Sequence, residues 1–112
     1  MTSSPLEQEI VAELRDLMAE EFSSLVDLYI DDSSKRLQAL QIAVVENQAQ
    51  QVNELAHSFK GASSNVGAHR LANLLQQVEH AARHHEVPSI AALMPAIATE
   101  FADVSKALRS YG

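Results

Sequence analysis

Apolar residues recur every three or four positions along most of the chain, and this helical spacing constrains the fold more than any other feature. The pattern runs through residues 6–18, about 20–45, about 48–66, about 68–85 and 90–111, with breaks near Glu20, Asn47, Gly67 and Pro88. Each long segment has one apolar stripe and the connections are short, which favours antiparallel packing of neighbouring helices. We therefore predict an all-α fold, an antiparallel up-down four-helix bundle in which the short first helix caps one end.

Local details of the segments lead to more specific expectations. Leu28 and Ile42 fall off the stripe of their segment, so each either touches a second neighbour or is exposed. Ser89 is expected to cap the last helix, and Pro95 predicts a kink or a restart within it. In the first segment, four residues at helical spacing are expected to face the bundle: Leu6, Ile10, Leu14 and Leu17.

Length and composition favour one helical domain. The 112 residues suit a single domain, expected at 6–112 after a flexible N-terminus at 1–5. Only three Gly and three Pro are present, which favours helix over sheet, and the absence of Cys excludes disulfides and thiolate metal sites. No apolar run approaches the ~20 residues that cross a bilayer, and the start does not resemble a signal peptide. We predict a cytoplasmic protein that does not act at a membrane.

The charge of the chain argues against a nucleic-acid partner. Fifteen acidic and eight basic side chains give a formal net charge of −7. The basic residues are scattered along the sequence, so they form no patch that could overcome repulsion from a phosphate backbone.

The third segment carries the residues that point to chemistry. On a helical wheel, its apolar residues centre opposite His57, which is therefore predicted to face solvent at mid-helix. Four other polar or small residues lie within about 60° of His57 on that wheel: Asn53, Lys60, Gly61 and Ser64.

Gly61 is the most informative of these neighbours. A glycine inside a helix costs about 1 kcal/mol relative to alanine, so an exposed one suggests a need for open space beside the imidazole. Lys60 is expected to be exposed and to bring its ammonium to the same place, and Ser64 adds a small hydroxyl. A neutral imidazole is a nucleophile near neutral pH, and phosphoryl transfer depends on positioning and charge neutralisation. This face is therefore suited to a transient phosphoryl group on His57.

The run from His57 to Gly67, HSFKGASSNVG, resembles the signature of histidine-containing phosphotransfer (Hpt) domains of two-component phosphorelays. In that signature, His-x-x-Lys-Gly is followed six residues later by a second Gly, on a helix of a four-helix bundle. The resemblance extends from about Glu7 to Leu108. It implies that the chain is a phosphocarrier and not an enzyme, and no ATP-binding segment for autophosphorylation is present.

The resemblance also assigns roles to single residues. His57 would be phosphorylated, Lys60 would stabilise the phosphoryl group, and Gly61 would leave room for it. Apart from the resemblance, we expect the more exposed ring nitrogen, Nε2, to be the modified atom. Many family members place a Gln on the following helix that hydrogen-bonds the imidazole. That position falls near Gln76 to Glu79, and Glu79 occupies the expected place. A carboxylate there could accept a ring N–H and would favour the imidazolium.

The partners implied by the resemblance are receiver domains. One, on a hybrid sensor kinase, would donate the phosphoryl group from an aspartyl phosphate, and another, on a response regulator, would accept it. The receiver would bring Mg²⁺ and the acidic residues that hold it, so this chain needs no cofactor of its own. We expect a stand-alone monomer. The predicted docking surface surrounds His57 and comprises Leu28, Asp31, Asp32, Asn53, Lys60, Gly61 and Ser64.

Two other hypotheses remain open at this point. His80 and His84 are four residues apart and could share a metal, with help from His85 or His69. They lie opposite the apolar stripe, so an ordinary polar surface is the preferred explanation and no metal site is predicted. Alternatively, the chain could be a helical adaptor that binds partners without chemistry, with His57 incidental.

Overall fold

The structure, a computed structural model, describes residues 4–111, and every regular element among them is helical. A single 3₁₀ turn, Ala19–Glu21, joins the first two helices. Of the N-terminal residues predicted to be flexible, 1–3 lie outside the described residues. The helices are α1 (Gln8–Met18), α2 (Phe22–Val45), α3 (Ala49–Asn65), α4 (His69–Arg83), α5 (Val87–Ile90) and α6 (Met94–Tyr111).

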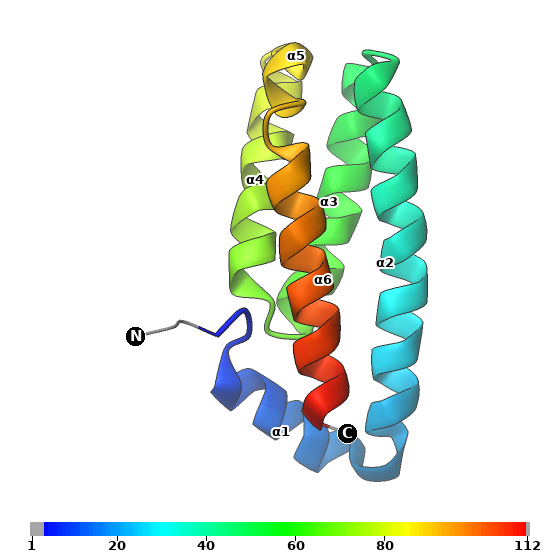
Figure 1. Cartoon of the computed structure of the whole chain (residues 1–112), viewed down its shortest axis with the longest axis vertical. Coiled ribbons are helices and arrows are strands. Elements are labelled where there is room, and N and C mark those ends of the chain that lie inside the picture. Colours follow the sequence, from blue (N-terminus) through cyan, green and yellow to red (C-terminus); the bar gives the residue numbers. More distant parts are fainter. Residues whose placement is uncertain (1–3, 112) are drawn as a thin grey trace.

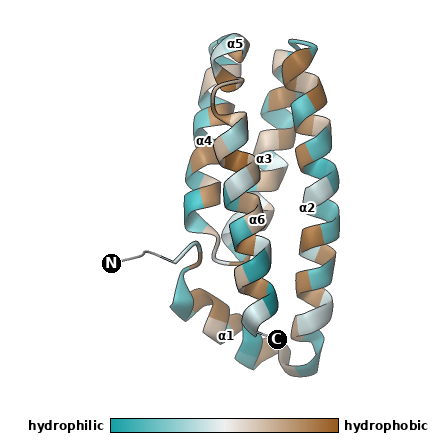
Figure 2. Ribbon diagram, in the orientation of Figure 1, coloured by the Kyte–Doolittle hydropathy of each residue, from teal (hydrophilic) through white to brown (hydrophobic). Residues whose placement is uncertain are grey.

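Helices α2, α3, α4 and α6 run side by side as an antiparallel bundle, and α1 lies across one end (Figure 1). The predicted all-α, up-down four-helix bundle with a short capping helix is confirmed. Apolar and polar residues alternate along each ribbon at helical spacing, so each helix presents one apolar side to its neighbours (Figure 2). Among residues 4–111, no helix is long and apolar enough to cross a membrane.

Three aromatic side chains occupy the middle of the core. Phe101 of α6 meets Phe59 of α3 edge to face at 5.6 Å between ring centroids, and Tyr29 of α2 at 6.2 Å. The hydroxyl group of Tyr29 is within 2.8 Å of the Ser63 hydroxyl, where both are buried. This hydrogen bond links α2 to α3 inside the bundle, and burial raises the pKa of Tyr29 to about 12.

The prediction of which residues in the first segment face the bundle is wrong in part. Leu6 is buried, but Ile10 is 38% exposed and Leu17 is 83% exposed. The reason is that α1 begins only at Gln8, so Leu6 precedes the helix and packs independently of its register. The residues of α1 that face the bundle are Val11, Leu14 and Met18.

The other local expectations have mixed outcomes. Leu28 and Ile42 are both exposed, at 59% and 58%. Pro95 lies in the first turn of α6, so the helix restarts there as one of the two alternatives predicted. Ser89 is not the N-cap, because it lies inside the short α5 and its hydroxyl donates to the carbonyl of Glu86 at 2.7 Å. Proline at position 88 is accommodated in the first turn of α5, which starts the helix earlier than expected.

Candidate functional site

His57 lies in the middle of α3, on the face that points away from the core. Its side chain is 71% exposed. The prediction that this imidazole faces solvent is confirmed. The opposite face of the same helix is buried through Val52, Ala56, Phe59 and Ser63.

Glu79 of α4 holds one nitrogen of the His57 ring. The Nδ1 atom lies 3.2 Å from Oε2 of Glu79, whose side chain is only 8% exposed. An ionised carboxylate accepts hydrogen bonds and donates none, so Nδ1 carries the proton in this contact, and a neutral ring held in this way has its lone pair on Nε2. The lone pair of Nε2 is then free on the exposed ring. Glu79 therefore occupies the position predicted for the residue that orients the ring.

The second oxygen of Glu79 pairs with Lys60. The Nζ atom of Lys60 lies 2.6 Å from Oε1 of Glu79 and donates to Oε1 of Gln76 at 2.8 Å. The expectation of an exposed Lys60 is wrong, since its side chain is only 24% exposed. The physical reason is that a buried carboxylate needs a cation beside it. Without a phosphoryl group on His57, the carboxylate of Glu79 balances the charge of Lys60.

Burial and pairing oppose each other at Glu79. Burial alone raises the pKa of this carboxyl group. Hydrogen bonds from Lys60 and from His57, with the attraction of their charges, outweigh burial, and the pKa lies below its usual 4.5. Glu79 is therefore ionised at neutral pH. Its carboxylate lies between the ring of His57 and the ammonium group of Lys60.

Gly61 leaves the space beside His57 open. A Cβ atom added at Gly61 would meet no atom within 4 Å outside its own helix backbone and chain neighbours. The open space expected at Gly61 is therefore present. Ser64, one turn further along α3, is also exposed.

Asn53 lies one turn before His57 but is occupied within the bundle. Its Nδ2 atom donates to the backbone carbonyl of Glu79 at 3.2 Å, and its side chain is half-buried. This bond ties α3 to α4 at the level where Glu79 meets the ring. Asn53 thus supports the position of Glu79 in addition to lying in the predicted docking surface.

Two contacts fix the register of α2 against α3. Tyr29 bonds to Ser63, and Nε of Arg36 donates to Oγ of Ser58 at 3.2 Å. Because the helices are antiparallel, the residues of α2 between these contacts lie beside the stretch of α3 that follows His57. Arg36 was not among the site residues predicted from the sequence. Its signal was weak, because a lone Arg on a polar stretch of helix is usually an ordinary surface residue.

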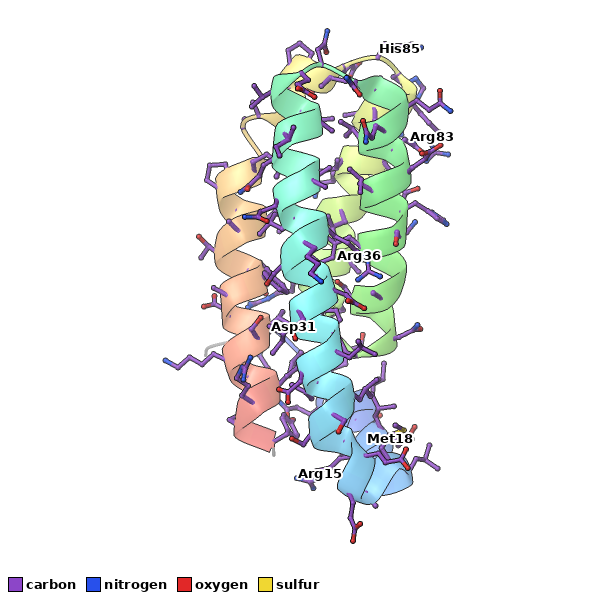
Figure 3. The ribbon with its side chains drawn as sticks, turned by 90° about the vertical axis from the view of Figure 1, so that its right-hand side faces the viewer. Arg15, Met18, Asp31, Arg36, Arg83 and His85 are labelled. Atoms are coloured by element: carbon purple, nitrogen blue, oxygen red, sulfur yellow. The ribbon has the colours of Figure 1, made fainter. Side chains whose placement is uncertain are left out.

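The predicted docking residues of α2 are only partly brought to this site. Asp32 is half-buried, and Leu28 is 59% exposed one turn before it. Asp31 is exposed, and Figure 3 shows it on a different side of α2 from Arg36, which lies on the α3 side. Asp31 is therefore set apart from the α3 side of α2, and docking at Leu28 and Asp32 stays a prediction.

The histidines proposed as metal ligands form a pair at the end of α4. The rings of His80 and His84 lie 4.4 Å apart between centroids. Within residues 4–111, no three His, Cys, Asp or Glu side chains are placed to hold a metal ion together.

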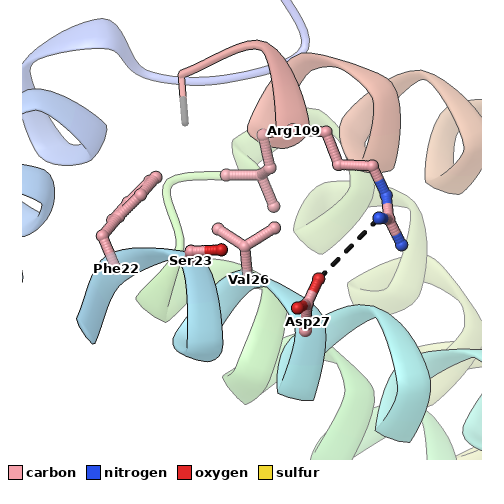
Figure 4. A pocket seen from close by; sticks show the side chains of 6 residues that line it. Phe22, Ser23, Val26, Asp27 and Arg109 are labelled. Atoms are coloured by element: carbon pink, nitrogen blue, oxygen red, sulfur yellow. Dashed lines mark ion pairs between the residues drawn. The ribbon is translucent and has the colours of Figure 1, made fainter. Parts of the chain in front are cut away.

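A surface pocket lies at the capped end of the bundle, away from His57. Nη1 of Arg109 is 3.7 Å from Oδ1 of Asp27 across this pocket (Figure 4). None of its residues comes from α3 or α4, so it adds nothing to the His57 site. The pocket is lined by Phe22, Ser23, Val26, Asp27, Leu108 and Arg109.

Comparison with known proteins shows the family of the chain and a similar solved structure. The family model of the Hpt domain matches residues 24–107. The crystal structure of histidine-containing phosphotransfer protein B (HptB) from Pseudomonas aeruginosa PAO1 is similar, with a TM-score of 0.93 and 34% sequence identity. That match covers 98% of this chain and 96% of the other. No curated protein sequence matches the chain significantly.

Proposed function

The chain belongs to the Hpt domain family, and from this premise we propose that His57 carries a phosphoryl group between two receiver domains. Hpt domains are phosphocarriers of phosphorelays, so a phosphotransfer role follows from the family. The donor we propose is the aspartyl phosphate of a receiver on a hybrid sensor kinase. The acceptor is the receiver of a response regulator, and both transfers would take place in the cytoplasm.

The observation that carries this proposal is the exposed imidazole of His57 with its Nδ1 atom on a buried carboxylate. The free lone pair of Nε2 attacks phosphorus, a nitrogen–phosphorus bond forms, and the bond from phosphorus to the aspartyl oxygen breaks. The aspartate leaves with the electron pair. The ring keeps its Nδ1 proton and gains a positive charge, which the Glu79 carboxylate balances. The reverse steps deliver the group to the second receiver.

The neighbours of His57 supply room and part of the charge compensation. Gly61 lets the receiver's aspartyl phosphate approach Nε2 without meeting a side chain. Lys60 can share its ammonium between Glu79 and a phosphoryl oxygen. In this proposal the receiver contributes Mg²⁺, which neutralises phosphoryl oxygens during transfer, and the acidic residues that hold it.

The proposal is tested by incubating the protein with receiver domains that carry a labelled phosphoryl group. The wild type should gain a label that is lost in acid and kept in alkali, as a phosphoramidate is, and His57→Gln should gain none. His84→Gln, which removes another exposed histidine, is the matched control and should be labelled like the wild type. Failure of every receiver to label the wild type would contradict the proposal. Intact signalling in His57→Gln would favour the adaptor hypothesis instead.

A further inference from the structure

A phosphoryl group on His57 would bring up to about two negative charges to a site whose lysine is already paired. The ammonium of Lys60 lies between Glu79 and Gln76. Moving it entirely onto phosphoryl oxygens would leave the buried Glu79 with only the ring as a partner, which is unfavourable. Lys60 can therefore compensate only part of the added charge.

Arg36 of α2 is a cation that reaches the same helix. Its Nε donates to Oγ of Ser58 at 3.2 Å and its Nη1 to Oγ of Ser33 at 3.4 Å. Both acceptors are neutral hydroxyl groups, and within residues 4–111 no carboxylate pairs with Arg36. A guanidinium has five N–H donors, so most of its hydrogen-bonding capacity and all of its charge remain available. Ser58 is the residue that directly follows His57.

The direction of Arg36 is informative because a carboxylate lies within reach on its own helix. Asp32 precedes it by four residues, the spacing at which Asp and Arg commonly pair on a helix. The guanidinium instead crosses to the hydroxyl of Ser58 on α3, and Figure 3 shows Arg36 on that side of α2. The positive charge of Arg36 is therefore held beside α3, the helix that carries His57. Lys35, the adjacent cation, is exposed.

We propose that Arg36 is a second phosphate-binding cation, whose guanidinium moves from Ser58 onto the oxygens of a phosphoryl group at Nε2 of His57. This rests on the phosphorylation of His57 proposed above. On a helical wheel, Ser58 and Lys60 fall on opposite sides of His57, so the two cations would hold the group from both flanks. A planar guanidinium suits two phosphoryl oxygens at once. The contact matters most after the receiver has left, because the carrier must then balance the charge alone.

The test uses phosphorus NMR of the phosphorylated protein over a range of pH. Potassium phosphoramidate, a small-molecule donor, supplies the phosphoryl group so that no receiver is needed. The resonance of phospho-His57 is the one that is missing from His57→Gln treated in the same way. A nearby cation favours the dianion, so the pH midpoint of this resonance should rise when the cation is removed. We expect Arg36→Gln to raise it by roughly half a pH unit.

Two matched variants separate a phosphate contact from other effects. Lys35→Gln removes the same charge from the adjacent exposed position and should move the midpoint clearly less than Arg36→Gln. Ser58→Ala removes the hydroxyl that holds Arg36 before phosphorylation but keeps the cation, so its midpoint should equal that of the wild type. Thermal unfolding of each unphosphorylated variant reports any purely structural role in joining α2 to α3.

The possible outcomes are distinct. An unchanged midpoint in Arg36→Gln, with a lower unfolding temperature shared by Ser58→Ala, would mean that Arg36 only links the helices and would overturn the inference. Equal shifts in Arg36→Gln and Lys35→Gln would also overturn it, because the effect would then come from overall charge. A wild type without the phospho-His57 resonance would contradict the proposed function itself.

Discussion

The buried carboxylate of Glu79 on α4 links two side chains of α3, the imidazole of His57 and the ammonium group of Lys60. Glu79 sits on α4, while His57 and Lys60 sit on α3, and each contributes one contact to the carboxylate. The charge of Glu79 has two consequences. It fixes the proton on Nδ1 of the ring, and it holds Lys60 in place before any phosphoryl group arrives. The contacts of Glu79 with His57 and Lys60 therefore depend on the ionisation of Glu79.

Replacing Glu79 with Gln should destabilise the protein in a pH-dependent way. At pH 7 we expect a loss of about 1–3 kcal/mol in the free energy of unfolding, because Lys60 loses a charged partner. The pKa of Glu79 is lowered in the folded state. Its contribution is therefore fully present above the ordinary value of 4.5 and is lost as the pH falls through the lower folded value.

Urea unfolding of the wild type and Glu79→Gln at pH 7, 5 and 3 measures this effect. The difference between the two proteins should narrow at pH 3. Glu54→Gln, which removes an exposed carboxylate from α3, should change stability by less than about 0.5 kcal/mol. If the free energies of unfolding of the wild type and Glu79→Gln differ by the same amount at all three pH values, the ionisation of Glu79 does not stabilise the fold and the prediction is wrong.

At the scale of helices, the two glycines of the signature have different physical roles. Gly61 lies inside α3 with open space beside it. Gly67 joins α3 to α4 with φ of +77°, and a Cβ there would lie 3.2–3.3 Å from Val11, Ile10 and the carbonyl oxygen of Glu7. The first position is open for a partner, whereas the second is required by the backbone and by the packing of the capping helix.

Alanine at each glycine should separate these roles. Gly61→Ala should raise the free energy of unfolding by about 0.5–1 kcal/mol because alanine favours helix, while transfer from a phosphorylated receiver slows. Gly67→Ala should lower the free energy of unfolding, because the left-handed conformation and the close contacts are both unfavourable for alanine. Urea unfolding and receiver labelling measure the two effects. Transfer by Gly61→Ala that is as fast as transfer by the wild type, or faster, would contradict the proposed role of the open space.

The burial of Tyr29 between α2 and α3 gives a prediction at alkaline pH. The pKa of Tyr29 is raised to about 12 from 10.0. The protonated hydroxyl therefore stabilises the fold fully below pH 10, and this contribution is lost between about 10 and 12 as the unfolded chain ionises first. Tyr29→Phe lacks this titration, so it should lose less stability than the wild type between pH 9 and pH 11 in urea unfolding. Parallel losses in the two proteins would contradict the assignment.

The long helices and the exposure of His57 could be predicted because both depend on periodicity within one helix. The pairing of Lys60 could not, because it depends on how far α4 brings Glu79 into the bundle. The same limit hid Arg36, whose role depends on the register between α2 and α3. Contacts between helices are set by packing, and a single sequence reports them only where a known family pattern covers the position, as it does at Glu79.

At the scale of the whole molecule, the capping helix was the least predictable element. An apolar stripe of three or four residues fits more than one register, and α1 is only 11 residues long. Its actual docking combines Val11 with Leu6, which lies before the helix and is buried. The backbone nitrogen of Glu7 donates to the carbonyl of Gly67 at 2.8 Å, so the cap is also attached to the α3–α4 connection.

Two leucines of this end offer a matched test of how the cap stabilises the bundle. Leu6 is 2% exposed and Leu17 is 83% exposed, so the same substitution probes a buried and a solvated site. Leu6→Ala should lower the free energy of unfolding by about 2–4 kcal/mol through lost burial and a residual cavity, whereas Leu17→Ala should change it by less than about 0.5 kcal/mol. Urea unfolding followed by circular dichroism gives both values. Because the cap packs on the connection that ends α3, Leu6→Ala should unfold in one transition with the bundle. A separate early transition, or equal losses in the two variants, would show that α1 is not an integral part of the core.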